Sequence, residues 1–147
     1  MYSHFLVPLD GSPLSSRAIA HSVELARRLG ARITGFVAEP LPPIPGDSAH
    51  PAAHQREAEL HRARTEAHAR TILADFEAAA KAAGVPFEGR FFRTDRVDES
   101  IAEAALEFGC DLLVMATHGR GAVGEMLFGS HTKHVISLST LPMLVLH

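Results

Sequence analysis

The sequence has little of several residues on which particular classes of protein depend. Its 147 residues include one cysteine, Cys110, and no tryptophan. A single cysteine cannot form an intramolecular disulfide or a zinc site built on cysteines, and it fits a reducing compartment. No run approaches the roughly 18 apolar residues of a membrane-spanning helix, and the first residues lack the basic and apolar segments of a signal peptide. We therefore expect a cytoplasmic protein without a membrane span.

An excess of basic residues is also missing. The chain has 14 lysine and arginine residues against 17 aspartate and glutamate residues, which gives a formal net charge of −3. Such a chain has no general attraction for a phosphate backbone, so we do not expect it to bind nucleic acid. The composition is otherwise ordinary for a globular protein, with 46% hydrophobic residues. A chain of this length is expected to fold as a single domain, residues 1–147.

Apolar runs and helical segments alternate along the chain. The runs are rich in Val, Ile, Leu and Phe and are continuous rather than alternating, which is typical of strands covered on both faces of a parallel sheet. We expect strands at His4–Leu9, Arg32–Ala38, Phe87–Phe92, Asp111–Ala116 and Pro142–Leu146. Helical spacing of apolar residues predicts helices at 13–29, 55–83, 97–108 and 130–138. This alternation predicts an α/β fold, a doubly wound parallel sheet of five strands with helices on both faces.

Local signals mark several of the expected boundaries. Ser12 is the expected N-cap of the first helix, and Gly30 follows its end. Asp95 or Asp98 is expected to open the third helix. The segment Pro40–Pro51 holds five of the nine prolines and predicts an exposed loop inside the domain.

A glycine-rich segment follows the fourth expected strand, where α/β sheets commonly bind ligands. In it, Gly119 and the pair Gly129-Ser130 bracket nine residues, and the pair opens the last expected helix. Free amides at a helix N-terminus, together with glycines that allow close approach, favour a phosphate group there. Ser130 would serve as N-cap and hydroxyl donor, and Arg120 as a cation. A turn and a capped helix without any ligand would explain the same glycines.

The same segment contains G-x-G-x-x-G, Gly119 to Gly124, which is the fingerprint of dinucleotide-binding proteins. That fingerprint belongs to the first strand-to-helix turn and needs an acidic residue about 20 positions later to bind the ribose. No acidic residue follows Glu125. We therefore reject a dinucleotide site, and the lack of a Gly-Lys-Ser/Thr triplet excludes a P-loop.

Asp10 directly follows the first expected strand. A carboxylate at this position could accept hydrogen bonds from a ribose hydroxyl or an adenine amino group, or it could hold a hydrated divalent ion through water. Its alternative role is that of a turn residue that helps to cap the first helix. We favour the binding role, because Ser12 is already expected to supply the cap.

Ten histidines are many for a chain of this length. Three recur every seven residues on the second expected helix: His54, His61 and His68. Seven residues rise about 10 Å along a helix, too far to share one metal ion. His131 and His134 are closer together, but the sequence offers them no third ligand, so we expect no metal site and interpret the helical histidines as a solvated face. From the residues alone, His118 is the one histidine expected near a ligand.

Nothing in the sequence predicts covalent catalysis. A Gly-x-Ser-x-Gly motif is missing, and Cys110 is expected at the start of a buried strand. We therefore assign no catalytic residue.

Four segments together make the sequence resemble a known family. They are VPLDGS at the first strand, DLLVMATHG at the fourth, the G-x9-G-S spacing from Gly119 to Ser130, and the closing LPMLVLH. In these features the chain is similar, over essentially its whole length, to the ATP-binding branch of the universal stress protein (UspA-like) family. The resemblance implies a Rossmann-like fold, similar to that of the adenine nucleotide alpha hydrolases, with strand order 3-2-1-4-5.

The resemblance also implies a set of nucleotide-binding residues, with ATP and Mg²⁺ as ligands and no metal ligand from the protein. Those that would line the nucleoside are Pro8, Leu9, Asp10, Val37 and Met115. Those that would lie at the phosphates are Gly119, Arg120, Gly129, Ser130 and His131, and His118 beside Gly119 belongs to the same nucleotide-binding set. Ala116 stands where the family's G-x2-G-x9-G-S/T motif has its first glycine, and its methyl group would either crowd the ribose or merely adjust its position. Thr94-Asp95-Arg96 likewise replaces a Gly-x-Pro turn.

In function, the resemblance implies an ATP-binding protein of the stress response that regulates through nucleotide occupancy, with an unidentified protein partner and at most slow ATP hydrolysis. It also implies a homodimer through the last strand, Pro142–Leu146, and the apolar character of that edge strand independently favours a covering partner. One alternative is a dimeric interaction module of this fold that no longer binds nucleotide, for which Ala116 is the argument. Another is a small-molecule enzyme, which lacks a convergent catalytic set.

Overall fold

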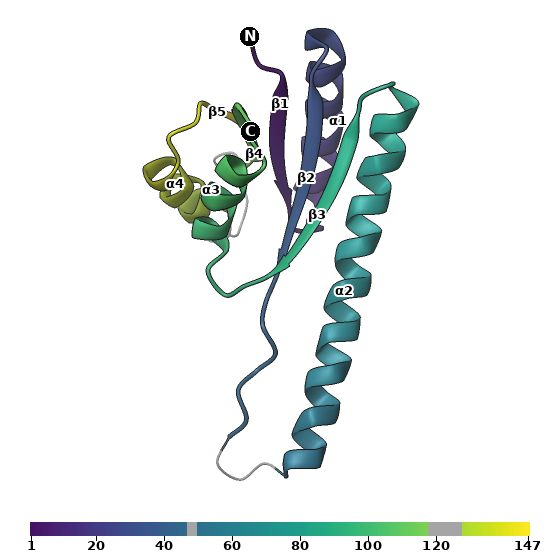
Figure 1. Cartoon of the computed structure of the whole chain (residues 1–147), viewed down its shortest axis with the longest axis vertical. Coiled ribbons are helices and arrows are strands. Elements are labelled where there is room, and N and C mark those ends of the chain that lie inside the picture. The colour runs from purple at the N-terminus through teal and green to yellow at the C-terminus, as the bar shows by residue number, and fades with distance from the viewer. Residues whose placement is uncertain (47–49, 118–127) are drawn as a thin grey trace.

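The computed structural model of the chain describes residues 1–46, 50–117 and 128–147. Within these residues, five strands alternate with four helices (Figure 1). The strands are β1 (His4–Leu9), β2 (Arg32–Glu39), β3 (Phe87–Arg93), β4 (Leu112–Ala116) and β5 (Met143–Leu146). The helices are α1 (Pro13–Leu29), α2 (Pro51–Ala82), α3 (Val97–Glu107) and α4 (Phe128–Leu138).

The strands form one parallel sheet in the order β3-β2-β1-β4-β5, which confirms the expected fold and strand order. β1 lies in the middle, paired along its whole length with β2 and through Phe5 and Leu6 with β4. The chain first proceeds from β1 to β2 and β3 on one side, and then returns to add β4 and β5 on the other. The strand order therefore reverses between β1 and β4, and this opens a crevice at their carboxyl ends.

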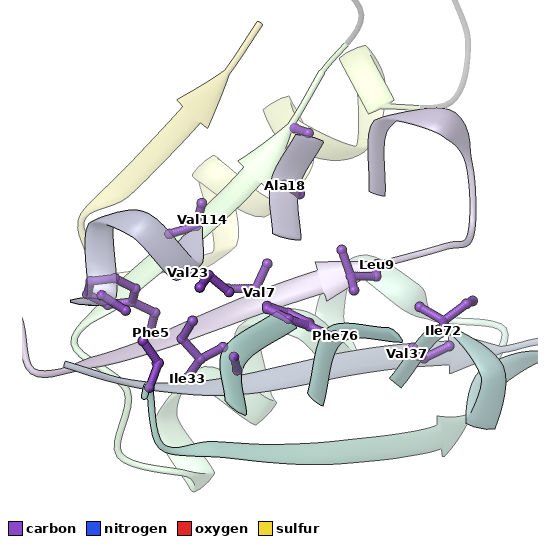
Figure 2. Packing of buried hydrophobic residues seen from close by; sticks show 14 of the residues in the cluster. Phe5, Val7, Leu9, Ala18, Val23, Ile33, Val37, Ile72, Phe76 and Val114 are labelled. Atoms are coloured by element: carbon purple, nitrogen blue, oxygen red, sulfur yellow. The ribbon is translucent and has the colours of Figure 1, made fainter. Parts of the chain in front are cut away.

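Two apolar cores lie on opposite faces of this sheet, because successive side chains of a strand point to opposite sides. In the first core, Val7 of β1 packs among side chains from α1 and α2 that include Phe76 (Figure 2). In the second core, Leu6 packs with Ile101 of α3 and Val135 of α4. The helices thus cover the sheet in two pairs, α1 with α2 and α3 with α4.

Two helices begin earlier than the sequence predicts. α2 begins at Pro51 instead of residue 55, since a proline is tolerated in the first turn, where its missing N–H has no helical partner to lose. α4 begins at Phe128, so Ser130 lies inside its first turn, and the expectation that Ser130 is the N-cap is wrong.

α2 is much longer than the sheet that it covers. Its 32 residues span about 48 Å, whereas the seven residues of β3 span about 23 Å. The buried residues of α2 all lie in its C-terminal half: Ala69, Ile72, Phe76 and Ala80. Its N-terminal half extends past the end of the sheet, and segment 40–46 extends past the same end (Figure 1). Neither α2 nor any other helix of the described residues is long and apolar enough to cross a membrane.

Candidate functional site

A cavity of about 200 Å³ lies at the carboxyl ends of β1, β2 and β4, on the face that α3 and α4 cover. It is lined by Pro8, Leu9, Asp10, Phe36, Ala38, Val97, Ile101, Met115 and His131. The lining is mostly apolar, with Asp10 and His131 as its ionisable members. Because the strand order reverses here, this is the position at which sheets of this kind bind ligands.

Five residues of the expected binding set line this cavity: Pro8, Leu9, Asp10, Met115 and His131. Val37 does not. Side chains alternate along a strand, so the Val37 side chain faces the first core, and its neighbours Phe36 and Ala38 line the cavity instead. Only the backbone of Val37 is available to a ligand in this cavity. Ala116 also packs in the first core, where it borders a shallow hollow with Leu14 under the turn after β1.

The structure describes only some of the residues that are expected at the phosphates. His118, Gly119 and Arg120 lie outside the described residues. Gly129 and Ser130 lie in the first turn of α4, whose leading amides have no acceptor within the helix. Because His131 directly follows them and lines the cavity, the start of α4 lies at its edge.

Asp10 organises the turn that joins β1 to α1. Its Oδ1 accepts hydrogen bonds from the Ser12 amide at 2.9 Å and from the Ser15 hydroxyl at 3.3 Å, and Ser15 Oγ accepts one from the Gly11 amide at 3.1 Å. The Ser12 side chain makes no capping hydrogen bond, and its Oγ is buried without a partner among the described residues. The expectation that Ser12 caps α1 through its side chain is therefore wrong, and Asp10 has a structural role as well as a place in the cavity.

A second polar group links α3 to α4 beside the cavity. Asp98 Oδ1 lies 2.5 Å from His131 Nδ1, and Asp98 Oδ2 lies 2.8 Å from His134 Nδ1. The Asp98 side chain is only 12% exposed. Asp95 or Asp98 was expected to open α3, but Arg96 occupies the N-cap position and Asp98 lies in the first turn. The spacing of the two histidines was visible in the sequence, whereas their shared carboxylate was not.

Two histidines of α2 are bound to the end of β2, which corrects the interpretation of a merely solvated face. His68 Nδ1 lies 2.5 Å from Oε1 of Glu39, and His61 Nε2 lies 3.1 Å from the carbonyl oxygen of Pro40. Within the described residues, no group of three or more histidine, cysteine, aspartate or glutamate side chains could hold a metal ion. These histidines therefore attach α2 to the sheet.

Cys110 is buried just before β4. Burial, together with the neighbouring Asp111 carboxylate, raises the pKa of its thiol to about 11. Since the thiolate is the reactive form of cysteine, this residue is a poor nucleophile near neutral pH.

Comparison with known proteins gives a consistent result over the full length of the chain. The model of the "Universal stress protein family" matches residues 1–147. A universal stress protein of Thermus aquaticus, encoded in the 3′ region of a QAH/OAS sulfhydrylase gene, is 33% identical over 147 residues, with 99% of this chain and 98% of the relative aligned.

Solved structures agree with the sequence comparison. A universal stress protein family member from Burkholderia pseudomallei is 26% identical with a TM-score of 0.74, and the match covers 99% of this chain and 96% of that one. A universal stress protein solved in complex with cAMP is also 26% identical, with a TM-score of 0.68 and coverage of 99% and 97%.

Proposed function

The chain belongs to the universal stress protein family, and from this premise we propose that it binds an adenine nucleotide, with ATP and Mg²⁺ as the expected ligands. The nucleotide would occupy the cavity at the carboxyl ends of β1, β2 and β4. The observation that carries the proposal is the composition of this cavity, which combines apolar walls, the Asp10 carboxylate and the start of α4 at the point where the strand order reverses.

The apolar walls suit the nucleoside. Phe36, Ile101 and Met115 offer the surfaces against which a purine ring packs. Asp10 Oδ2 takes no part in the capping bonds that occupy Oδ1, so it is the oxygen available to a ribose hydroxyl or an adenine amino group. The relative that was solved in complex with cAMP supports an adenine nucleotide as the class of ligand.

The start of α4 suits the phosphates. The amides of its first turn, which includes Gly129 and Ser130, and the positive end of the helix dipole both favour an anion. His118, Gly119 and Arg120 complete the phosphate site in this proposal. Mg²⁺ would neutralise part of the phosphate charge, held by phosphate oxygens and water, since Mg²⁺ commonly keeps several waters when it binds with a nucleotide.

We further propose that the protein is a cytoplasmic regulator of a stress response, whose partner affinity changes with nucleotide occupancy. Hydrolysis of ATP would be slow at most, because the site residues bind the nucleotide and none is assigned to activate water. The protein partner is unidentified.

A homodimer through Pro142–Leu146 belongs to the same proposal. β5 is the edge strand of the sheet beside β4, and Leu144 on it is 36% exposed. An unpaired apolar edge favours pairing with a second copy across a two-fold axis. A dimeric module that no longer binds nucleotide is the second candidate, since Ala116 stands at the first glycine of the family motif; its methyl group, however, packs in the first core and does not line the cavity.

The experiment that separates the two candidates is release of the bound ligand. The protein would be purified without denaturation, heated, and the supernatant analysed by mass spectrometry, followed by titration calorimetry of the emptied protein with ATP. Our proposal expects an adenine nucleotide in the supernatant and saturable binding of ATP. An empty supernatant together with no heat of binding at millimolar ATP would support the module that lacks nucleotide.

A further inference from the structure

Asp98, in the first turn of α3, contacts two histidines of α4, His131 and His134, one with each carboxylate oxygen. We propose that Asp98 is a positioning residue that fixes the His131 ring so that binding of the nucleotide phosphates is coupled to the uptake of one proton by His131. This inference rests on the proposed nucleotide binding. The observation behind it is that His131 both contacts Asp98 at 2.5 Å and lines the cavity.

The contact with Asp98 decides which nitrogen of His131 carries the proton. An ionised carboxylate can only accept hydrogen bonds, so Nδ1 of His131 must be the donor. In the neutral ring, Nε2 then has no proton and is an acceptor. Since Nδ1 is occupied by Asp98, Nε2 is the nitrogen left to face a ligand in the cavity.

An unprotonated Nε2 is unsuited to a phosphate, because both the nitrogen lone pair and the phosphate oxygens are acceptors. Once protonated, the same atom becomes a cationic donor, and such charge-assisted hydrogen bonds to phosphate are strong. A phosphate placed at the start of α4 therefore draws one proton onto His131. By linkage, a rise in pH weakens nucleotide binding that takes up a proton.

Among the described residues, Asp98 is the carboxylate that is hydrogen-bonded to His131. The charged or titratable groups on α3, on α4 and in the turn after β1 are Asp98, Glu99, Glu103 and Glu107 of α3, Arg96 at its N-cap, Asp10 after β1, and Lys133 and His134 of α4. Glu99 Oε1 lies 3.6 Å from Nε of Arg96, the N-cap residue of the same helix, and Asp10 is engaged in the turn after β1. β2 and β4 bring only Phe36, Ala38 and Met115 to the cavity.

His134 provides a matched control for His131. Both residues are on α4 and both contact Asp98 through Nδ1, but His134 does not line the cavity. A His134→Gln variant should therefore keep the proton coupling that a His131→Gln variant loses.

The coupling is measured by titration calorimetry of the full chain with ATP near pH 7.5, in HEPES and in Tris, whose different ionisation enthalpies reveal the number of protons taken up. The phosphates of ATP also exchange protons, near about pH 6. The quantity compared is therefore the difference in proton uptake between wild type and variant. We expect wild type and His134→Gln to take up a larger fraction of a proton than His131→Gln. We also expect wild-type affinity to fall more steeply with rising pH than that of His131→Gln, by up to about ten-fold per pH unit.

Asp98 is tested by charge removal and conservative rescue. Asp98→Asn should lose most of the proton uptake, and Asp98→Glu should restore part of it. A merely structural role for Asp98 would lower affinity equally at every pH and leave proton uptake unchanged, and that result would overturn the inference.

A second measurement does not depend on nucleotide binding or on any variant. The ¹⁵N spectrum of histidine-labelled protein at high pH should place neutral His131 in the tautomer that carries its proton on Nδ1. A neutral His131 with its proton on Nε2 would contradict the inference.

Wild-type protein that binds ATP without the extra proton uptake would overturn the inference alone. Wild-type protein that binds no nucleotide at any pH would overturn the proposed function and, with it, the inference.

Discussion

Nδ1 of His68, on α2, lies 2.5 Å from Oε1 of Glu39, the last residue of β2. The Glu39 side chain is 10% exposed, whereas that of His68 is 51% exposed. The imidazole therefore supplies a hydrogen-bond partner to a carboxylate that water scarcely reaches. It does so next to Ala69, the first buried residue of α2, where the helix meets the sheet.

A His68→Ala variant should be less stable by about 1–3 kcal/mol, the usual cost of leaving a buried polar group without its partner. Urea denaturation followed by circular dichroism measures the change. His54→Ala, on the part of α2 that extends past the sheet, is the control and should cost less than about 0.5 kcal/mol. Equal losses in both variants would mean that the Glu39 contact contributes nothing.

A Gly35→Ala variant should be destabilised by overpacking. A Cβ atom at Gly35 would lie 2.8 Å from the Phe87 ring and 3.0 Å from the Phe76 ring, and these rings pack with their centroids 4.8 Å apart. One ring must move, at a cost of about 1–3 kcal/mol. Gly89→Ala, in the neighbouring strand, meets Leu73 at an ordinary 3.4 Å and should change little. Thermal or urea unfolding of the two variants compares them directly.

Two substitutions of Asp10 should separate its two roles. Asp10→Asn keeps an oxygen for the Ser12 amide, so stability should change by less than about 1 kcal/mol, while the lost charge lowers ATP affinity about ten-fold. Asp10→Ala should lose both affinity and about 1 kcal/mol of stability, because the turn loses its capping acceptor. Titration calorimetry and urea denaturation provide the two measurements. Unchanged affinity in both variants would leave Asp10 with its structural role alone.

Stability should fall as the pH drops below neutral, in part because of His4. Burial, followed by the nearby Arg32 charge, lowers the pKa of His4 from its ordinary 6.5. The unfolded chain then binds a proton that the folded chain resists, so this contribution is complete above about pH 6.5 and is lost as the pH falls toward the lower folded value.

A His4→Gln variant tests this pH dependence. Its amide can still reach the Thr34 hydroxyl, which His4 Nε2 contacts at 2.8 Å, but it does not titrate. Urea denaturation at a series of pH values should give a flatter profile for the variant than for wild type between about pH 7 and pH 5. Parallel profiles would show that His4 is not responsible.

The strands could be predicted closely from local sequence. The central strands β1, β2 and β4 are apolar on both sides, since helices cover both faces of the sheet. Each observed strand agrees with its expected range to within one residue at either end. Their order in the sheet came with the family resemblance, because periodicity does not say which strands pair. The start of α2 was missed, because a proline-rich segment predicts a loop even when its last proline opens a helix.

The site was predictable where it depends on residues next to one another in the chain. Asp10 follows β1, and the rule for α/β sheets directs attention there. Asp98 was expected only at the start of a helix, because its histidine partners lie 33 and 36 residues later. Glu39 and His68 are 29 residues apart, so the seven-residue spacing of histidines on α2 could not reveal what they contact.

The length of α2 has a consequence for hydrodynamics. A particle with a helical arm beyond its globular body experiences more friction than a sphere of the same mass, so it elutes early from a gel-filtration column and tumbles slowly. A column calibrated with globular standards would then give the monomer too large an apparent mass, and the monomer could be mistaken for a dimer. The homodimer should therefore be judged by light scattering, which reads mass without assuming a shape, against the 15.8 kDa of one chain.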